Sequence, residues 1–150
     1  MDFCCKVWGN ISKGNLDRIH CLQKKAATVI LDRKSRAPSL PLFLELGWIL
    51  IHDRIKFMRA TIVLKALTYL SPRDITYLIL PFHKVHNIDT HVARRNLKLL
   101  KANTNSSKRT FAFLASSEWN LLSDSVKTST SLTLFKRNYS KMAFSNLKEV

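Results

Sequence analysis

The stretch from 52 to 70 constrains the fold most, because it is the longest segment with a helical repeat of apolar residues. The apolar residues that recur there every three or four positions are Ile55, Met58, Ile62, Leu64, Ala66, Leu67 and Leu70. This spacing places them on one broad face of an α-helix. We expect this helix to be the centre of the core of a mainly α fold.

Two further segments carry the same repeat. The segment 15–32 begins at Asn15, a plausible N-cap, and its apolar face comprises Leu16, Ile19, Leu22, Ala26, Val29 and Ile30. The segment 132–145 has a face made of Leu132, Phe135, Tyr139, Met142 and Ala143. Shorter helices are expected at 42–46, at 73–80 after the cap Ser71 and Pro72, and at 117–122.

Composition agrees with a small helical domain. The 150 residues are 46% hydrophobic and include only 3 Gly and 4 Pro, which is typical of a compact chain rich in helix. The length suits one domain or a fragment of one, with a loop at "RKSRAPSLP". We expect the three tryptophans, Trp8, Trp48 and Trp119, to anchor the core.

Residues 82–110 form a basic connector without helical periodicity. Within it, "NLKLLK" is a candidate strand that would pair with "RTFAFLA" across the turn "NTNSS". The predicted fold is therefore a small helical domain interrupted by one basic irregular segment, in which a short β-hairpin is a candidate.

The charge balance indicates a polyanionic partner. The chain has 25 Lys and Arg against 10 Asp and Glu, a net charge of +15. The candidate phosphate contacts in the connector are Arg94, Arg95, Lys98, Lys101, Lys108 and Arg109. A second basic patch comprises Lys24, Lys25, Arg33, Lys34 and Arg36. The connector either binds an RNA or DNA backbone with little sequence preference or is merely solvated, and the sequence leaves both open.

Aromatic and histidine side chains lie close to these cations. Phe111, Phe113 and Trp119 could stack on unpaired bases, but buried core positions are the favoured interpretation because aromatic residues are mostly buried. The histidines of the connector are expected to be surface or phosphate-contacting groups rather than metal ligands; they are His83, His86 and His91.

Features of catalytic and metal sites are missing from the pattern. The ten acidic residues are scattered singly, whereas metal-assisted phosphoryl transfer needs clustered carboxylates. Cys4, Cys5, His20 and Cys21 do not have zinc-ligand spacing, so buried thiols are favoured over a metal. We expect no catalytic residue, no metal and no cofactor.

Location is only broadly indicated. Three cysteines, an odd number, favour a reducing compartment over a disulfide framework, and the N-terminus lacks the pattern of a signal peptide. The longest apolar runs fall far short of the roughly 20 residues that cross a bilayer. An intracellular protein without membrane association is expected, either cytoplasmic or nuclear.

Five blocks of the chain, in order, resemble the C-terminal region of reverse transcriptases from jockey-like non-LTR (LINE) retrotransposons. The blocks are "DFCCKVWGN", "LDRIHCLQKKAATVIL", "PLFLELGWILIHDRIKFMRATIVLKALTYLSPRDI", "HNIDTHVARRNLKLLKANTNSSKRTFAF" and "EWNLLSDSVKTSTSLTLFKRNYSKM". The last is similar to the family's Trp-Asn-x-Leu-Pro segment and following helix. Thr28 and His91 stand where the family has Arg, which implies weaker phosphate contacts, and Ser123 stands where it has Pro, which implies a looser entry into the following helix.

The resemblance implies a region after the polymerase palm that helps to hold template RNA, primer or target DNA. The palm's Asp-Asp motif and the family's endonuclease domain are absent from this sequence, so a non-catalytic fragment is implied, with the missing palm as a candidate partner. Two alternatives stay open: a small nucleic-acid-binding protein adopted by the host, and a helical interaction module whose segment 52–70 packs on another chain.

Overall fold

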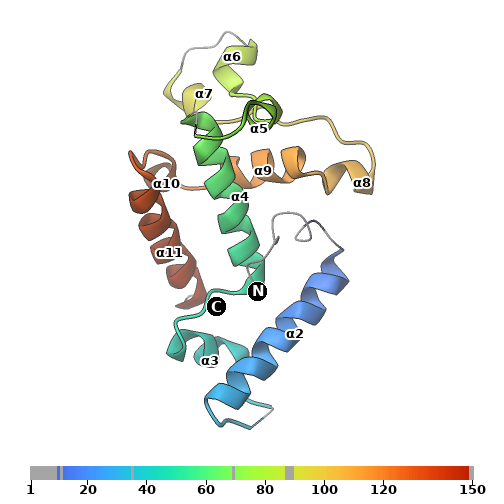
Figure 1. Ribbon diagram of the computed structural model, residues 1–150, viewed down its shortest axis with the longest axis vertical. Coiled ribbons are helices and arrows are strands. Elements are labelled where there is room, and N and C mark those ends of the chain that lie inside the picture. Colours follow the sequence, from blue (N-terminus) through green and yellow to red (C-terminus); the bar gives the residue numbers. More distant parts are fainter. Residues whose placement is uncertain (1–9, 11, 35, 69, 87–89, 149–150) are drawn as a thin grey trace. The chain divides into compact units, whose positions relative to one another are not determined.

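The structure is a computed structural model that describes residues 10, 12–34, 36–68, 70–86 and 90–148. The chain divides into two compact units, one of Met1–Ile55 with Tyr139–Val150 and the other of Lys56–Asn138. The described residues form ten helices and no sheet, which confirms the predicted mainly α class (Figure 1).

The first unit is built on helices α2 (Lys13–Ile30) and α3 (Ser39–Glu45), which pack against each other (Figure 1). Its core consists of Ala27, Leu42 and Phe43, and the partly buried residues packed on them are Leu31, Ala37, Leu46, Trp48 and Leu50. Trp48 stacks on Phe43 with ring centroids 6.5 Å apart, so it supports this core while remaining half-buried.

Helix α2 buries a different side from the one predicted. Gln23, Ala27 and Thr28 are its buried residues. The predicted core residues Leu22, Val29 and Ile30 are 56%, 80% and 59% exposed. The apolar repeat located the helix correctly but not its packed side, because Gln23 turns inward to bond the backbone of another segment. Ser12, not Asn15, occupies the N-cap position.

Helices α2 and α3 end in the same way. Arg33 N–H donates to the Thr28 carbonyl at 2.9 Å, and Trp48 N–H donates to the Phe43 carbonyl at 2.8 Å. These six-residue closures need a left-handed residue just after the helix. Gly47, with φ of 63°, supplies it after α3, and Asp32, with φ of 47°, supplies it after α2.

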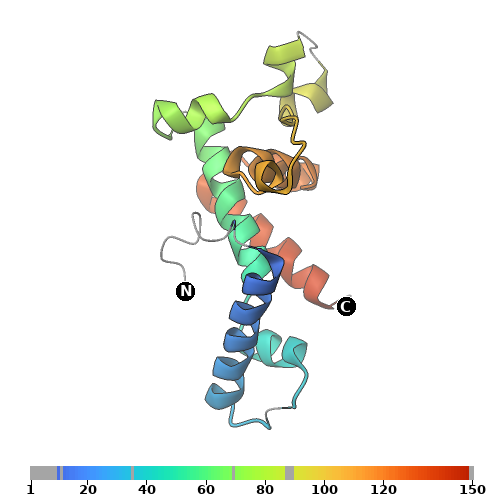
Figure 2. The ribbon, with the colours of Figure 1, turned by 90° about the vertical axis from the view of Figure 1, so that its right-hand side faces the viewer.

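The second unit contains most of α4 (Ile51–Leu67), the predicted central helix. Within this unit, Phe57, Ala60, Val63, Leu64 and Ala66 of α4 are all buried, which confirms its place in the core. The helices that follow are α5 (Arg73–Leu78), α6 (Phe82–His86), α7 (His91–Arg95), α8 (Asn105–Lys108), α9 (Phe111–Asn120), α10 (Asp124–Lys127) and α11 (Leu132–Lys148). In Figure 2, α9 is seen nearly end-on beside α4.

The predicted irregular segment with a β-hairpin is wrong in detail. Residues 82–110 contain three short helices, α6 to α8, and "FAFLA" lies in α9 rather than in a strand. The pairing found among the described residues is an isolated antiparallel bridge between Pro81 and Leu97. Helices of four or five residues are too short to show a repeat. Their starts are fixed locally instead: Thr90 accepts from Ala93 N–H, and Thr104 from Ser107 N–H, both at 3.1 Å.

Helix α9 begins six residues before the predicted segment 117–122. Its buried residues are Ala112, Ala115, Ser116 and Trp119, a helical spacing that the alternation of "RTFAFLA" concealed. Trp119 is a core residue, as predicted, and stacks on Phe135 of α11 with ring centroids 6.0 Å apart. Phe111 and Phe113 are half-buried. The predicted face of α11 is confirmed at Phe135, Tyr139 and Ala143, all of which are buried.

Candidate nucleic-acid interface

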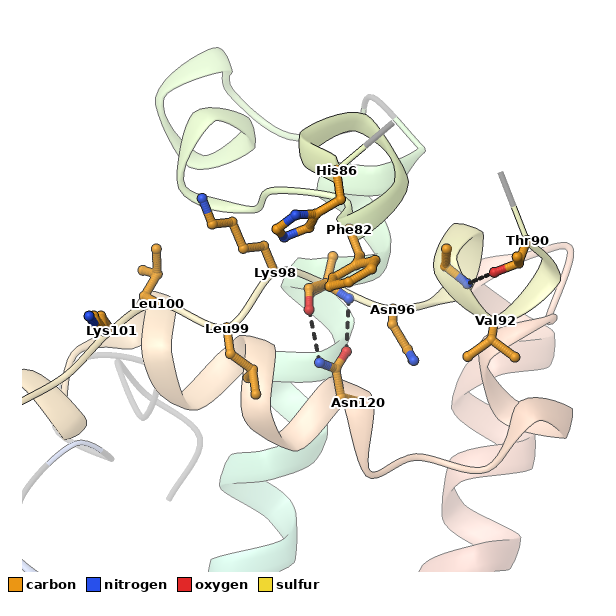
Figure 3. Close-up of a pocket in the computed structure, with 12 residues that line it drawn as sticks. Phe82, His86, Thr90, Val92, Asn96, Lys98, Leu99, Leu100, Lys101 and Asn120 are labelled. Atoms are coloured by element: carbon orange, nitrogen blue, oxygen red, sulfur yellow. Dashed lines mark hydrogen bonds between the residues drawn. The ribbon is translucent and has the colours of Figure 1, made fainter. Parts of the chain in front are cut away.

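Two consecutive side chains at the end of α9 hold the middle of the basic connector. Leu97 N–H donates to Asn120 Oδ1 at 2.8 Å, and Asn120 Nδ2 donates back to the Leu97 carbonyl at 2.9 Å (Figure 3). The indole Nε1 of Trp119 donates to the Arg95 carbonyl at 2.9 Å. Residues 95–97 are therefore fastened to a core helix by three hydrogen bonds from neighbouring side chains.

The preceding residue, Glu118, fixes α9 on α4. Arg59 Nε donates to Glu118 Oε2 at 2.8 Å, and Arg59 Nη2 donates to the other carboxylate oxygen. The two side chains are only 6% and 18% exposed. A buried bidentate ion pair tolerates little change in the relative position of its two side chains. The Arg59–Glu118 pair therefore sets the position of the helix that carries Trp119 and Asn120.

The opposite side of the connector is held by the chain before α6. Lys98 N–H donates to the Leu80 carbonyl at 2.8 Å, and Phe82 N–H donates to the Asn96 carbonyl at 2.9 Å. Lys127 of α10 adds hydrogen bonds from Nζ to Asn96 Oδ1 at 3.1 Å and to the Asn120 carbonyl at 2.9 Å. Burial lowers the pKa of this lysine, and Arg95 lowers it further, while Asp124 opposes both. Residues 95–98 thus have a defined place in the second unit.

An open groove of about 900 Å³ lies along this fixed backbone (Figure 3). The residues that line it are Phe82, His86, Thr90, Val92, Ala93, Asn96, Leu97, Lys98, Leu99, Leu100, Lys101 and Asn120. Phe82 and His86 lie one turn apart on α6, with ring centroids 4.4 Å apart. The groove therefore combines an aromatic pair with two lysines and has no acidic side chain among its lining residues.

The structure gathers only two of the six predicted connector cations at the groove, Lys98 and Lys101. Arg95 Nη1 donates to Asp124 Oδ2 at 3.0 Å, so its charge is already paired. Arg94 is exposed on α7. Lys108 and Arg109 are exposed at the end of α8, where Arg109 Nε donates to the Asn105 carbonyl at 3.3 Å.

The second predicted patch belongs to the first unit and is a separate surface. Lys25, Lys34 and Arg36 are exposed, and Lys24 is half-buried. Arg33 Nη2 lies 3.7 Å from Glu45 Oε2, an exposed ion pair. None of these five cations is among the residues that line the groove beside Leu97.

Histidines of the first unit lie in a small cluster. The His20 ring meets the edge of Phe43 at a centroid distance of 5.6 Å and lies 6.0 Å from the ring of His52. His52 Nε2 lies 3.5 Å from Asp17 Oδ1. Burial lowers the pKa of His20, the nearby His52 lowers it further, and Asp17 partly offsets these effects.

The remaining predicted groups show no metal site. Cys21 is exposed, so the buried thiol predicted there is wrong: it lies on the side of α2 that faces away from the packed Gln23 and Ala27. Cys4, Cys5 and Trp8 lie outside the described residues. Within the described ranges, no three His, Cys, Asp or Glu side chains are grouped so that they could hold a metal ion. His91 is exposed and His83 half-buried.

Sequence reasoning missed the side chains that shape the groove. Phe82 and His86 lie four positions apart in "PFHKVH", the spacing that puts two side chains on one helical face, and this was the available signal for pairing Phe82 with a histidine that had been named only as a surface or phosphate-contacting group. Asn120 follows Trp119 in the block "EWN", but the sequence alone does not show which groups its side-chain amide bonds. Lys127 gave no signal because its partners are distant in sequence.

Comparisons with protein-family models, with curated proteins and with solved structures find no match to this chain. Separately, none of the helices in the described ranges has the length and apolar character needed to span a bilayer.

Proposed function

We propose that this chain is a non-catalytic nucleic-acid-binding fragment, related to the region after the palm of a jockey-like reverse transcriptase. In this proposal it contacts the sugar–phosphate backbone of RNA or DNA. The observation that carries the proposal is the fixed backbone of 95–98, which places Lys98 beside an open groove that Lys101 also lines, in a chain of net charge +15. Cations held on an ordered backbone bind phosphates with a smaller entropic cost than cations on a free loop.

The residues behind the family resemblance support the same interpretation. In the block that begins "EWN", Glu118 bonds Arg59, Trp119 bonds the Arg95 carbonyl and Asn120 bonds Leu97. All three act on the position of the basic connector. A motif whose side chains hold a cationic segment in place is what a backbone-binding surface requires.

The test is the salt dependence of binding to a fluorescently labelled structured RNA and to a matched duplex, measured by anisotropy. The variant Lys98→Ala/Lys101→Ala/Lys108→Ala should lower affinity for both probes. It should also reduce the slope of log affinity against log salt by about 0.9 for each duplex phosphate that the variant no longer neutralises. Arg95 is left intact because it pairs with Asp124.

The matched control is Lys13→Ala/Lys136→Ala/Arg137→Ala, which removes the same charge from exposed positions away from the groove. If both variants lose affinity and slope equally, binding reflects net charge alone and the connector has no special part in it.

A second candidate function, a protein-interaction module, is supported by the apolar side chains exposed on α2. It does not rest on α4, the helix that the sequence pattern suggested for this role, whose large apolar residues are buried or half-buried. Val29→Glu should abolish binding to an isolated palm domain of the resembled family if α2 is the docking helix, and unchanged binding would exclude that role.

A further inference from the structure

The groove beside Leu97 has the size and lining of a ligand site rather than of a flat phosphate-binding surface. Its volume of about 900 Å³ lies within the range of roughly 300–1,000 Å³ that small-molecule sites occupy. Apolar side chains such as Leu97, Leu99 and Val92 make up much of its wall. A phosphate group would gain nothing from contact with these apolar side chains.

The aromatic pair supplies a stacking surface. Phe82 and His86 lie with centroids 4.4 Å apart and ring planes 38° apart. His86 is exposed and Phe82 is half-buried, so the pair borders the open groove (Figure 3). A nucleic-acid base offers a flat face to such rings only when it is unpaired and unstacked, because in a duplex both faces are covered by neighbouring bases.

The cations stand where the phosphates of such a nucleotide would lie. The Lys98 side chain runs beside His86 with its amino end pointing away from Phe82, and Lys101 lies further along the same segment (Figure 3). The lining residues include no Asp or Glu to oppose an anion.

Three polar side chains of the lining use their acceptor oxygens within the chain. The Asn120 amide bonds Leu97, the Thr90 hydroxyl accepts from Ala93 N–H, and Asn96 Oδ1 accepts from Lys127. These acceptor oxygens are therefore already engaged by the chain itself rather than directed at a base. A base held mainly by stacking is accepted whatever its identity.

From these observations we propose that the groove holds an unpaired nucleotide of a single strand, with its base against Phe82 and His86 and its phosphates at Lys98 and Lys101. This rests on the proposed function and deepens it, because it makes the chain selective for single strands over duplexes and indifferent to base sequence.

The experiment compares two labelled RNAs under the same salt conditions: an unstructured single strand of about 12 nucleotides, a length typical of single-strand sites, and a hairpin duplex. Phe82→Leu keeps an apolar side chain in place but removes the aromatic face. It should weaken single-strand binding roughly fivefold or more and change duplex binding less than about twofold. Leu121→Ala, exposed and outside the groove, is the control.

A second variant guards against misfolding. His86 is exposed, so His86→Ala should leave the thermal melt unchanged and still weaken single-strand binding. 2-Aminopurine placed in the strand reports stacking directly, and its fluorescence should fall on binding to the parent but much less on binding to Phe82→Leu.

The outcomes separate the two proposals. If Phe82→Leu and His86→Ala bind the single strand like the parent, or weaken both probes equally, the nucleotide site is overturned. The backbone-binding function survives that result as long as the triple lysine variant loses more affinity than the control variant Lys13→Ala/Lys136→Ala/Arg137→Ala. If the triple lysine variant also binds like the parent, both proposals fail.

Discussion

In each of the two units, a side-chain amide forms hydrogen bonds with a backbone segment, but the two amides have different roles. In the first unit, Gln23 Nε2 donates to the Ile49 carbonyl at 2.9 Å, and Gln23 Oε1 accepts from Ile51 N–H at 3.1 Å. In the second, the amide of Asn120 makes the same two kinds of bond to Leu97. In both cases a side-chain amide replaces a neighbouring strand as the partner of a backbone segment.

The segments they hold differ. Ile51 is the first residue of α4, where helix N–H groups lack partners within the helix, so Gln23 supplies a cap from a distant part of the sequence. Leu97 lies in no helix, and the cations next to it face the groove. The amide of Gln23 therefore caps the start of a core helix, whereas the amide of Asn120 holds a segment that lines the groove. Changes at the first should affect stability alone, and changes at the second should affect binding as well.

The largest expected effect concerns the ion pairs of the two units. Glu118→Ala removes the carboxylate that forms a bidentate ion pair with the buried Arg59 guanidinium, which should lower the free energy of unfolding by about 3–5 kcal/mol. Glu45→Ala removes the exposed partner of Arg33 and should cost no more than about 1 kcal/mol. Urea denaturation followed by circular dichroism measures both.

Glu118→Gln is the control for that prediction, because it keeps the shape and one acceptor oxygen. It should fall between the parent and Glu118→Ala. Equal losses for Glu118→Ala and Glu45→Ala would mean that the pair in the second unit is not an anchor.

The amide substitutions come next. Gln23→Leu and Asn120→Leu each leave a buried N–H without an acceptor, at a cost of about 1–3 kcal/mol. Hydrogen exchange should become faster at the Ile51 amide in the first variant and at the Leu97 amide in the second. Only Asn120→Leu should also weaken RNA binding. A loss of affinity in Gln23→Leu at a temperature where it is fully folded would break the distinction between the two amides.

The smallest effect is a pH dependence in the first unit. Burial, aided by His52, lowers the pKa of His20, so the unfolded chain binds this proton more tightly than the folded chain does. The contribution of His20 to the free energy of unfolding should therefore be complete above about pH 6.5, the ordinary histidine pKa. The free energy of unfolding should fall as the pH drops below that value.

His20→Gln should reduce the loss of melting temperature between about pH 7.5 and about pH 5.5, on either side of the histidine range. His91→Gln, exposed in the second unit, should leave that loss as it is in the parent. If both variants retain the full loss, the acid sensitivity arises elsewhere.

The long helices were predictable, and so were the shorter helices α3 and α5, whereas the helices of four or five residues were not. Helix α11 has 17 residues, long enough for its apolar face to stand out. Helix α4 was found as the core helix, but of its predicted face Met58, Ile62 and Leu67 are only half-buried and Leu70 is 69% exposed. The helix α2 was found, but its packed side was not, since the bonds of Gln23 outweigh the apolar character of Leu22 and Val29. The four- and five-residue helices of the connector depend on threonine caps and on partners elsewhere in the chain.

Of the candidate site, only the presence of basic residues in the connector was predictable. Lys98 and Lys101 were named from charge alone, together with Arg95, whose pairing with Asp124 spans 29 residues and leaves no local signal. The groove itself depends on the bond between Leu97 and Asn120, 23 residues apart, and on the meeting of α6 with that strand-like segment. Such contacts belong to the tertiary structure.

The fluorescence of Trp119 can report whether the basic connector is attached to α9. Its ring is buried against Phe135, and its N–H is bonded to the Arg95 carbonyl. In a chain where Trp8 and Trp48 are replaced by Phe, emission would come from this indole alone. Its wavelength would then follow, without any added dye, whether the basic connector is seated on α9 or has come away from it.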